Sequence, residues 1–338
     1  MIDVFPFSGY SIAVLGLGTS GLATARALMS SGAEVWAWDD DEKAREHANK
    51  FKIPLTNLYE KNFNETTTLV VSPGIPITKP QPHPIVSQAL EARCEIIGDA
   101  ELLARAQRDA AYIGITGTNG KSTTTALVGH IMQTCGREAE VGGNLGIPCL
   151  ELESLGSEGT YILEMSSFQL DLTYSITFDI GVLLNISPDH LERHGGMEGY
   201  INAKRQLFHR QTRPRTAVIS VDDENCKKIF EELLIADEQN VIPISGCKPV
   251  SGGVFAQNGI LYDDTEGSNT MVIPLTGIAA LPGEHNYQNA AASYAACKMA
   301  GVHPSVIQAC IQSYPGLAHR QEAADLIDII AIFNVSED

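Results

Sequence analysis

The chain has 338 residues, with 41 Asp or Glu against 23 Lys or Arg, which gives a formal net charge of −18. Nucleic acid and anionic membrane surfaces would be repelled by that field, and no block of five or more basic residues offsets it. We therefore expect no nucleic-acid partner and no membrane partner. Any phosphate in a ligand must be held by local devices such as backbone N–H groups, single cations or divalent metal.

The length predicts two or three domains, at roughly 100–200 residues per domain. A hydrophobic content of 44% excludes a disordered or fibrous protein. The seven cysteines are odd in number and scattered, which is typical of free thiols in a reducing compartment. The N-terminus lacks the basic region of a signal peptide, and no apolar run approaches the ~20 residues of a membrane span. These features predict a cytoplasmic protein, which we expect to act as a monomer on small molecules.

The first hundred residues alternate short apolar runs with helical patterns. Such βαβ alternation predicts a parallel sheet with helices on both faces, a Rossmann-like α/β fold. The strands are expected at residues 11–15, 34–38, 68–71 and 95–97, and the helices at 21–31 and 85–92.

A second set of α/β units begins after a helix expected at residues 100–108. Its strands are expected at 112–116, 161–165, 180–185 and 216–220, its hairpins at 251–270, and its helices at 124–132, 285–299 and 304–313. We predict a first domain over residues 1–100 and a central α/β domain over 101–320. The remaining residues 321–338 are too few for a third domain.

The string GLGTSG at Gly16–Gly21 follows one predicted strand and opens a helix, and Asp39 stands at the end of the next strand. This order matches the dinucleotide-binding pattern, in which a diphosphate lies on the helix N-terminus and an acid binds a sugar hydroxyl. A ligand-free strand-to-helix turn is the alternative. On this motif alone, an NAD-dependent oxidoreductase stays open.

A second glycine-rich string, GITGTNGKST, occupies residues 114–123 between a predicted strand and a predicted helix. Its glycines let backbone N–H groups surround oxygen atoms, Lys121 can reach the β- and γ-phosphates, and Ser122 offers a hydroxyl to Mg²⁺. Ile115 departs from the usual P-loop spacing, and a glycine-rich turn with a surface lysine is the alternative. The string nevertheless favours a nucleoside triphosphate and a P-loop NTPase-like central domain.

The string GITGTNGKST resembles the Mur ligases and the folylpolyglutamate synthetases. Other matching strings are SPGIP at 72–76, GDAEL at 98–102, GGNLG at 142–146, LEMSSFQL at 163–170, NISPDHLERHG at 185–195, GEHNYQNA at 283–290 and HRQE at 319–322. The resemblance implies an ATP-dependent ligase that joins a carboxylate to an amine through an acyl phosphate. SPGIP and SSFQL favour the branch that adds D-glutamate to UDP-MurNAc-L-alanine in peptidoglycan-precursor synthesis.

The same resemblance implies Mg²⁺ as cofactor and assigns the site residues. The catalytic residues would be Lys121, Glu164, His190 and Lys204, and the metal ligands Ser122, Glu164, His190 and Lys204. The ATP-binding residues would be Gly117, Thr118, Asn119, Gly120, Lys121, Ser122, Thr123, Asn286, Asn289 and Arg320. The UDP-substrate-binding residues would be Gly18, Thr19, Ser20, Asp39, Ser72, Pro73, Gly74, Asn144 and Ser166.

Several of these residues also have a purely structural interpretation. Glu164 could be a solvated or capping group, and Lys204 could be a solvated helix residue. Asn286 and Asn289 could be helix caps. The family instead implies a carbamylated Lys204, an anion able to bind Mg²⁺, and amides from Asn286 and Asn289 that face the adenine.

The family also carries a third domain that binds the incoming amino acid, introduced by a string like Asn-Asp-Ser-Lys. Here residues 334–337 read Asn-Val-Ser-Glu, which predicts little or no turnover by this chain. Three hypotheses therefore stand: an impaired ligase, a non-catalytic module that binds a nucleotide or UDP-sugar, and an NAD-dependent oxidoreductase.

Overall fold

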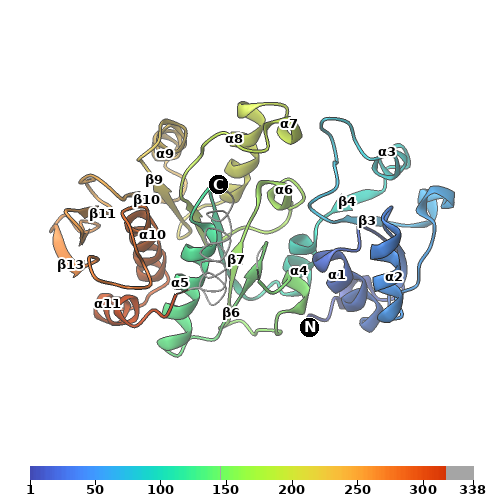
Figure 1. The fold of residues 1–338 in the computed structure, drawn as a ribbon, viewed down its shortest axis with the longest axis horizontal. Helices are drawn as coiled ribbons and strands as arrows, with labels where there is room; N and C mark the ends of the chain where they lie inside the picture. The colour runs from blue at the N-terminus through green and yellow to red at the C-terminus, as the bar shows by residue number, and fades with distance from the viewer. Residues whose placement is uncertain (145, 317–338) are drawn as a thin grey trace, which may run out of the picture.

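A computed structural model describes residues 1–144 and 146–316, which form two β-sheets flanked by helices (Figure 1). The α/β class predicted from the sequence is confirmed. The first sheet lies at the N-terminal end of the molecule, and the second runs across its centre toward the C-terminal helices.

The first sheet is parallel throughout, as predicted. Its strands lie in the order β2 (Glu34–Trp38), β1 (Ser11–Leu15), β3 (Thr68–Val71) and β4 (Glu95–Ile97). Its helices are α1 (Thr19–Ser30), α2 (Glu42–Lys50) and α3 (Pro84–Glu91). Helices cover both faces, so β3 is buried along its whole length and its sequence TLVV is nearly continuously apolar.

The second sheet is parallel from β6 to β11 and ends in an antiparallel edge formed by β12 and β13. Its order is β13 (Thr270–Pro274), β12 (Ile260–Asp263), β11 (Val254–Gln257), β10 (Asn240–Ser245), β9 (Thr216–Ser220), β8 (Ile180–Leu183), β5 (Ala111–Thr116), β7 (Thr160–Glu164) and β6 (Ala139–Gly143). The β11–β12 pair confirms the hairpin predicted in this region.

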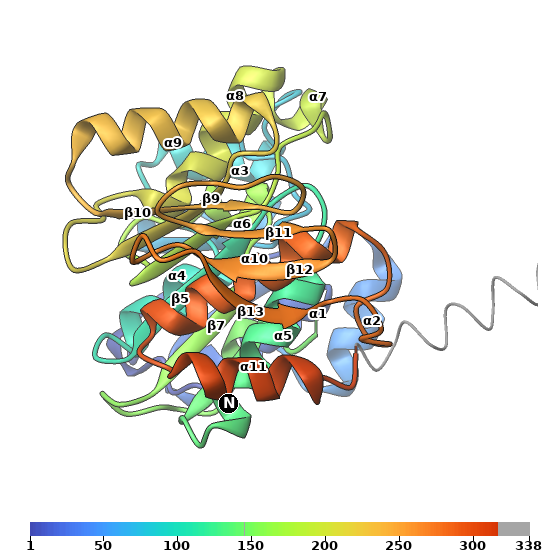
Figure 2. The same ribbon diagram turned by 90° about the vertical axis from the view of Figure 1, so that its left-hand side faces the viewer.

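Helices cover both faces of this second sheet (Figure 2). One face carries α9 (Glu224–Ala236), and the other carries α5 (Lys121–Thr134), α10 (His285–Met299) and α11 (Pro304–Gln312). Helix α8 (Met197–Arg205) and the single turns α6 (Ser167–Leu170) and α7 (Leu191–His194) follow the central strands. Among residues 1–144 and 146–316, no helix is both long enough and apolar enough to cross a bilayer.

One of the buried hydrophobic clusters spans both sheets. Helix α4 (Asp99–Ala106) follows β4, and its Leu103 belongs to the same buried cluster as Val14 of the first sheet and Leu163 of the second. The backbone N–H of Gly98 also donates to the carbonyl of Leu172 at 3.1 Å. The first sheet is therefore packed against the central one rather than tethered to it. The domain boundary near residue 100 falls at α4 and stays a prediction.

Some elements differ from the sequence prediction. Helix α5 begins at Lys121, three residues earlier than predicted, which places the lysine in the first helical turn. Helices α2 and α9 and strands β6 and β10 were not predicted. Helix α2 buries only Ala48, so it has no apolar stripe to detect.

Candidate active site

The loop from Gly117 to Gly120 connects β5 to α5 at the carboxyl edge of the central sheet. Gly120 has a φ of +85°, and a Cβ there would lie 2.3 Å from Oδ1 of Asn289, so only glycine fits. Asn185 holds the loop, because its carbonyl accepts from the Thr118 N–H at 2.9 Å and its Oδ1 accepts from the Asn119 N–H at 2.8 Å. The N–H groups of the first turn of α5 have no intrahelical acceptor and can bind an anion.

Two lysines meet at the carbonyl of Gly117. Nζ of Lys121 donates to that oxygen at 3.0 Å and to the Thr118 carbonyl at 2.9 Å, and Nζ of Lys204 donates to Gly117 at 2.9 Å. Lys204 is 1% exposed and lies 4.7 Å from the ring centroid of Tyr200, so it is not the solvated helix residue of the ordinary alternative. Burial, and then the charge of Lys121, lower the pKa of Lys204 to about 7. Burial also lowers the pKa of Lys121.

Glu164 ends β7 beside these lysines and is 3% exposed, which excludes a solvated role. Its Oε1 accepts from Nδ2 of Asn144 at 3.0 Å, and its negative charge acts on Lys121. Ser122 lies in the first turn of α5. The predicted substrate residue Asn144 therefore positions the predicted metal ligand Glu164.

His190 lies further out than Glu164. Its side chain is 54% exposed, its ring centroid is 5.0 Å from that of Phe168, and its Nε2 is 3.5 Å from a carboxylate oxygen of Asp189. Within residues 1–144 and 146–316, no three His, Cys, Asp or Glu side chains form a group able to hold a metal. The donor set still suits Mg²⁺, because the Glu164 carboxylate and the Ser122 hydroxyl are hard oxygen ligands and this ion keeps several waters or phosphate oxygens.

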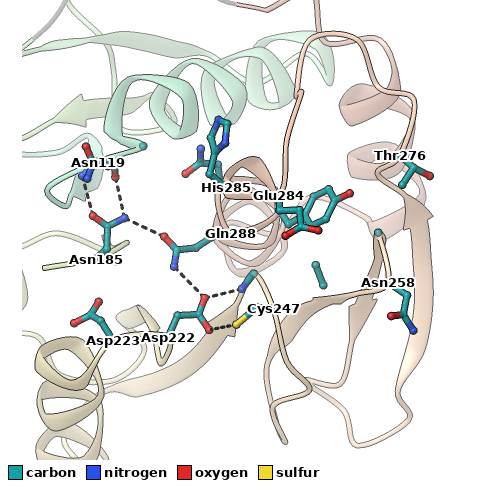
Figure 3. A pocket seen from close by; sticks show the side chains of 16 residues that line it. Asn119, Asn185, Asp222, Asp223, Cys247, Asn258, Thr276, Glu284, His285 and Gln288 are labelled. Atoms are coloured by element: carbon teal, nitrogen blue, oxygen red, sulfur yellow. Dashed lines mark hydrogen bonds between the residues drawn. The ribbon is translucent and has the colours of Figure 1, made fainter. Parts of the chain in front are cut away.

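A cavity of about 840 Å³ opens from the P-loop toward the β11–β12 hairpin (Figure 3). A chain of side-chain hydrogen bonds crosses its floor: Nδ2 of Asn185 donates to Oε1 of Gln288 at 3.0 Å, and Nε2 of Gln288 donates to Oδ2 of Asp222 at 3.0 Å. Asn258 and Thr276 line the far end. A cavity of this size, with one end at a P-loop, can hold a nucleotide.

The two predicted adenine-binding asparagines play different parts. Asn289 lines the cavity, and its Nδ2 donates to Oδ1 of Asn286 at 2.9 Å. Asn286 is 1% exposed and donates to the carbonyl of Pro282 at 2.6 Å. Helix α10 has no side-chain N-cap, so neither asparagine is the helix cap of the ordinary alternative. Asn286 therefore supports Asn289 from behind.

The first glycine loop lies at the carboxyl edge of the first sheet. A Cβ on Gly21 would lie 1.8 Å from the carbonyl oxygen of Gly16, so these backbones touch, whereas a Cβ on Gly18 would meet nothing within 4 Å. Asp39 accepts from the N–H of Leu17 at 2.6 Å. The open side of the loop, at the N-terminus of α1, therefore faces away from the protein and can receive a ligand.

The other predicted substrate residues lie on both sides of this loop. Thr19 and Ser20 form the first turn of α1. Oγ of Ser72 donates to the carbonyl of Gly16 at 3.0 Å, and Pro73 and Gly74 follow directly. Ser166 caps α6 of the central unit through a capping box with Gln169. Arg320 and residues 334–337 lie outside the described residues.

Most of the residues that line the cavity were not predicted as site residues from the sequence, among them the three that form the hydrogen-bond chain. Asn185 begins the string NISPDHLERHG and Gln288 stands next to Asn289, so the matching strings contained the signal for both. Asp222 follows β9 at the sheet edge where the P-loop lies, and its position after an apolar strand was the available signal.

The chain matches two families of domains. Residues 10–98 match the Mur ligase MurD-like N-terminal domain, and residues 115–297 match the Mur ligase middle domain.

Two solved structures share the fold. The UDP-N-acetylmuramate:L-alanyl-γ-D-glutamyl-meso-diaminopimelate ligase from Neisseria meningitides superimposes with a TM-score of 0.63 at 15% identity, over 91% of this chain and 99% of that one. The UDP-N-acetylmuramate–alanine ligase from Thermotoga maritima gives 0.57 at 18% identity, over 92% and 70% of the two chains.

Similar sequences extend over the whole chain. The UDP-N-acetylmuramoylalanine–D-glutamate ligase of Rhodospirillum rubrum is 46% identical over 342 residues, which cover 100% of this chain and 72% of that protein. The ligase of the same name from Phenylobacterium zucineum is 45% identical over 343 residues, covering 100% of this chain and 73% of the relative. At this identity and coverage, together with both domain matches, the chain belongs to the Mur ligase family.

Proposed function

We propose that the chain is an ATP-dependent ligase of peptidoglycan-precursor synthesis that joins D-glutamate to UDP-MurNAc-L-alanine through an acyl phosphate. The observation that carries this proposal is the 46% identity to a D-glutamate ligase along the whole chain. The geometry supports it, because a nucleotide-sized cavity and a P-loop lie in the unit that packs against a second glycine loop.

The first step is phosphoryl transfer. A carboxylate oxygen of UDP-MurNAc-L-alanine attacks the γ-phosphorus of ATP; a new O–P bond forms, the bond to the β,γ-bridging oxygen breaks, and ADP leaves. The attacking carboxylate and the triphosphate repel each other at ~332/(ε·r) kcal/mol per charge pair. Lys121 and the first-turn N–H groups of α5 offset that repulsion, with Lys121 exchanging the carbonyls of Gly117 and Thr118 for phosphate oxygens.

The second step is acyl transfer. The amine of D-glutamate attacks the acyl carbon, the C–N bond forms, the bond from that carbon to the phosphate oxygen breaks, and inorganic phosphate leaves while the amine loses a proton to water. Lys121, at the Gly117 carbonyl, stabilises the negative charge that develops on the departing phosphate.

Glu164 and Ser122 would hold Mg²⁺, which supplies charge neutralisation at the phosphate oxygens. In its protonated form, Lys204 has no lone pair with which to coordinate Mg²⁺. It would join these ligands only as a carbamate, and its pKa of about 7 favours that modification because only the neutral amine reacts with CO₂. His190 stays a predicted ligand at the outer edge of the site.

Two alternatives differ in what they bind. A non-catalytic module would bind UDP-MurNAc-L-alanine and ATP without releasing phosphate, and an NAD-dependent oxidoreductase would bind NADH at the Gly16–Gly21 loop. The oxidoreductase hypothesis leaves the P-loop, Lys121 and Lys204 without a role.

Calorimetric titration with UDP-MurNAc-L-alanine, ATP·Mg²⁺ and NADH, followed by a phosphate-release assay with and without D-glutamate, tests the proposal. We expect UDP-MurNAc-L-alanine and ATP·Mg²⁺ to bind together, and we expect phosphate release to be slow and to require both. NADH binding without binding of the UDP substrate would overturn the proposal, and binding of both ligands without any phosphate release would favour the non-catalytic module.

We also propose that the protein works as a monomer in the cytoplasm. Its seven cysteines are free, and five of them are buried, as suits a reducing compartment. Fractionation of cells that express the chain, and light scattering of the purified protein, test the two statements.

A further inference from the structure

The short helix α7 stands between the two predicted binding sites and is anchored on the central unit. His194, at its end, has Nε2 at 2.9 Å from Oγ of Ser167 and Nδ1 at 3.3 Å from the carboxylate of Asp171. Its ring stacks on Phe168 at 5.3 Å between centroids, with 12° between the planes. The imidazole is 3% exposed, so it fixes α7 against α6.

Arg193 of the same helix reaches across to the first unit. One terminal nitrogen donates to the carbonyl of Gly74 at 2.7 Å, and the other donates to the carbonyls of Ile75 at 3.0 Å and Pro73 at 3.4 Å. The guanidinium also lies over the ring of Phe168, 4.5 Å from its centroid. Three successive carbonyls of one loop are therefore held by one planar cation; the donors of an arginine lie in a fixed plane on separate nitrogens, whereas those of a lysine all leave a single, freely rotating nitrogen.

The loop that Arg193 holds is the one predicted to contact the UDP substrate. Ser72 ties its near end to the first glycine loop through the carbonyl of Gly16. Because a trans peptide is planar, its N–H points opposite to its carbonyl, so the contact with Pro73 helps to set the direction of the Gly74 N–H. A Cβ on Gly74 would meet nothing within 4 Å, so this part of the loop is open to a ligand.

At its other end, α7 leads to the phosphate site. His190 lies three residues before Arg193, and its ring also contacts Phe168, at 5.0 Å between centroids. Asp189, which precedes His190 in the sequence, acts through its charge on both Lys121 and Lys204. A shift of the substrate loop would thus pass through Arg193 and Phe168 to the residues beside the P-loop.

We propose that Arg193 is a positioning residue that holds the substrate loop, Ser72–Ile75, to helix α7, so that binding of the UDP substrate and binding of the nucleotide are coupled through its guanidinium. The inference rests on the proposed function for the identity of the two ligands. It adds a thermodynamic link between two sites on different sheets, and such a link is reciprocal: each ligand changes the affinity for the other by the same factor.

Calorimetry on the full chain tests this link. UDP-MurNAc-L-alanine is titrated with and without a saturating non-hydrolysable ATP analogue and Mg²⁺, for the parent and for Arg193→Gln and Arg193→Lys. The parent should bind the UDP substrate several-fold more tightly when the nucleotide is present. In Arg193→Gln, affinity for the UDP substrate should fall by about tenfold, since charge-assisted hydrogen bonds are lost, and the effect of the nucleotide should disappear. Arg193→Lys should retain part of the affinity and little of the coupling.

Arg205 offers a matched control, since it also lies on the central unit and pairs with Glu232 on the surface, away from the loop. Arg205→Gln should keep the affinities and the coupling within twofold of the parent. If Arg193→Gln fails to fold, as judged by circular dichroism, Arg193→Lys carries the test.

The outcomes separate the two proposals. A parent chain that does not bind UDP-MurNAc-L-alanine refutes the proposed function. A parent that binds both ligands with coupling, and an Arg193 variant that keeps the same coupling factor, refutes the role of Arg193. Nucleotide affinity measured in the absence of the UDP substrate should stay within twofold in every variant, because Arg193 does not touch the nucleotide cavity.

Discussion

The two glycine loops have similar sequences and similar positions, each between a parallel strand and a helix, yet they are built differently. In GLGTSG the outer glycines serve packing: a Cβ on Gly16 would lie 2.7 Å from Cβ of Ser72, and one on Gly21 would lie 1.8 Å from the Gly16 carbonyl. In the second loop, Gly120 makes room for Asn289 and the backbone is arranged around two lysines.

The difference also concerns charge. The first loop contains no cation, and its acid, Asp39, accepts from the backbone N–H groups of Leu17 and Asp41 at 2.6 and 2.8 Å. The second loop brings two ammonium groups to one carbonyl. In a chain with a net charge of −18, a diphosphate at the first loop would depend on helix N–H groups, whereas a triphosphate at the second would also depend on lysines.

The largest effect should come from removing the cation of the second loop. We expect Lys121→Met to weaken binding of ATP·Mg²⁺ by on the order of 100-fold, because a lysine–phosphate contact in a partly buried site is lost. Binding of UDP-MurNAc-L-alanine should stay within twofold when measured without nucleotide. Calorimetric titration of both ligands measures the contrast.

Lys227 provides the control for that substitution. It lies on α9, 47% exposed and 3.9 Å from the carboxylate of Glu231, so Lys227→Met should leave both affinities unchanged. An equal loss of affinity for both ligands in Lys121→Met would contradict the assignment of ATP to the second loop and of the UDP substrate to the first.

A smaller effect is expected within the first loop, where replacing Gly21 should destabilise the protein more than replacing Gly18. Gly21→Ala should lower the free energy of unfolding by roughly 2 kcal/mol or more, since its Cβ meets backbone rather than a movable side chain. Gly18→Ala should change it by less than about 0.5 kcal/mol, because its φ is −67° and the space is open. Urea denaturation of the two variants checks this order, and equal stability would contradict the packing role of Gly21.

Much of the fold follows from local sequence patterns. The strands at 11–15, 34–38, 68–71, 95–97 and 216–220 were predicted with the bounds that the structure shows, because they are short apolar runs between turn residues. Strand β6 was missed because its sequence, AEVGG, has two glycines and one apolar branched residue. Strand β10 contains Pro243, which argues against a strand in any local prediction.

The parts of the site that could be predicted are those that lie in short motifs of consecutive residues. The P-loop and Glu164, at the end of its strand, belong to such motifs. The contact between Arg193 and Gly74 joins residues 119 apart, and the support of Asn289 by Asn286 depends on side-chain direction within a helix. The first contact is fixed by how the two sheets and their helices pack, on which local patterns carry no information; the helical spacing of three residues makes the second contact possible but does not say which asparagine faces the cavity.

The smallest expected effect concerns Lys204, the lysine of helix α8 that contacts the nucleotide loop. Lys204 has its pKa lowered to about 7 by burial and by the charge of Lys121, so its neutral amine predominates above that pH and its ammonium below. With ¹³C-labelled bicarbonate, we expect a carbamate signal in the ¹³C NMR spectrum that grows from pH 6 to pH 8. Lys204→Met should remove the signal, and intact-mass measurement of the protein in bicarbonate provides a second readout.

Carbamylation would sharpen the contrast between the loops. The amine nitrogen attacks CO₂ and releases a proton, so a cation that repels Lys121 becomes an anion that attracts it, and Lys121 no longer competes with Lys204 for the Gly117 carbonyl. The carbamate would join Glu164 and Ser122 as a ligand of Mg²⁺, so bicarbonate should raise the affinity for ATP·Mg²⁺ by a few-fold in the parent and not in Lys204→Met. An unmodified amine at pH 8 in bicarbonate would contradict this, and would leave Lys204 as a largely uncharged hydrogen-bond donor to the Gly117 carbonyl.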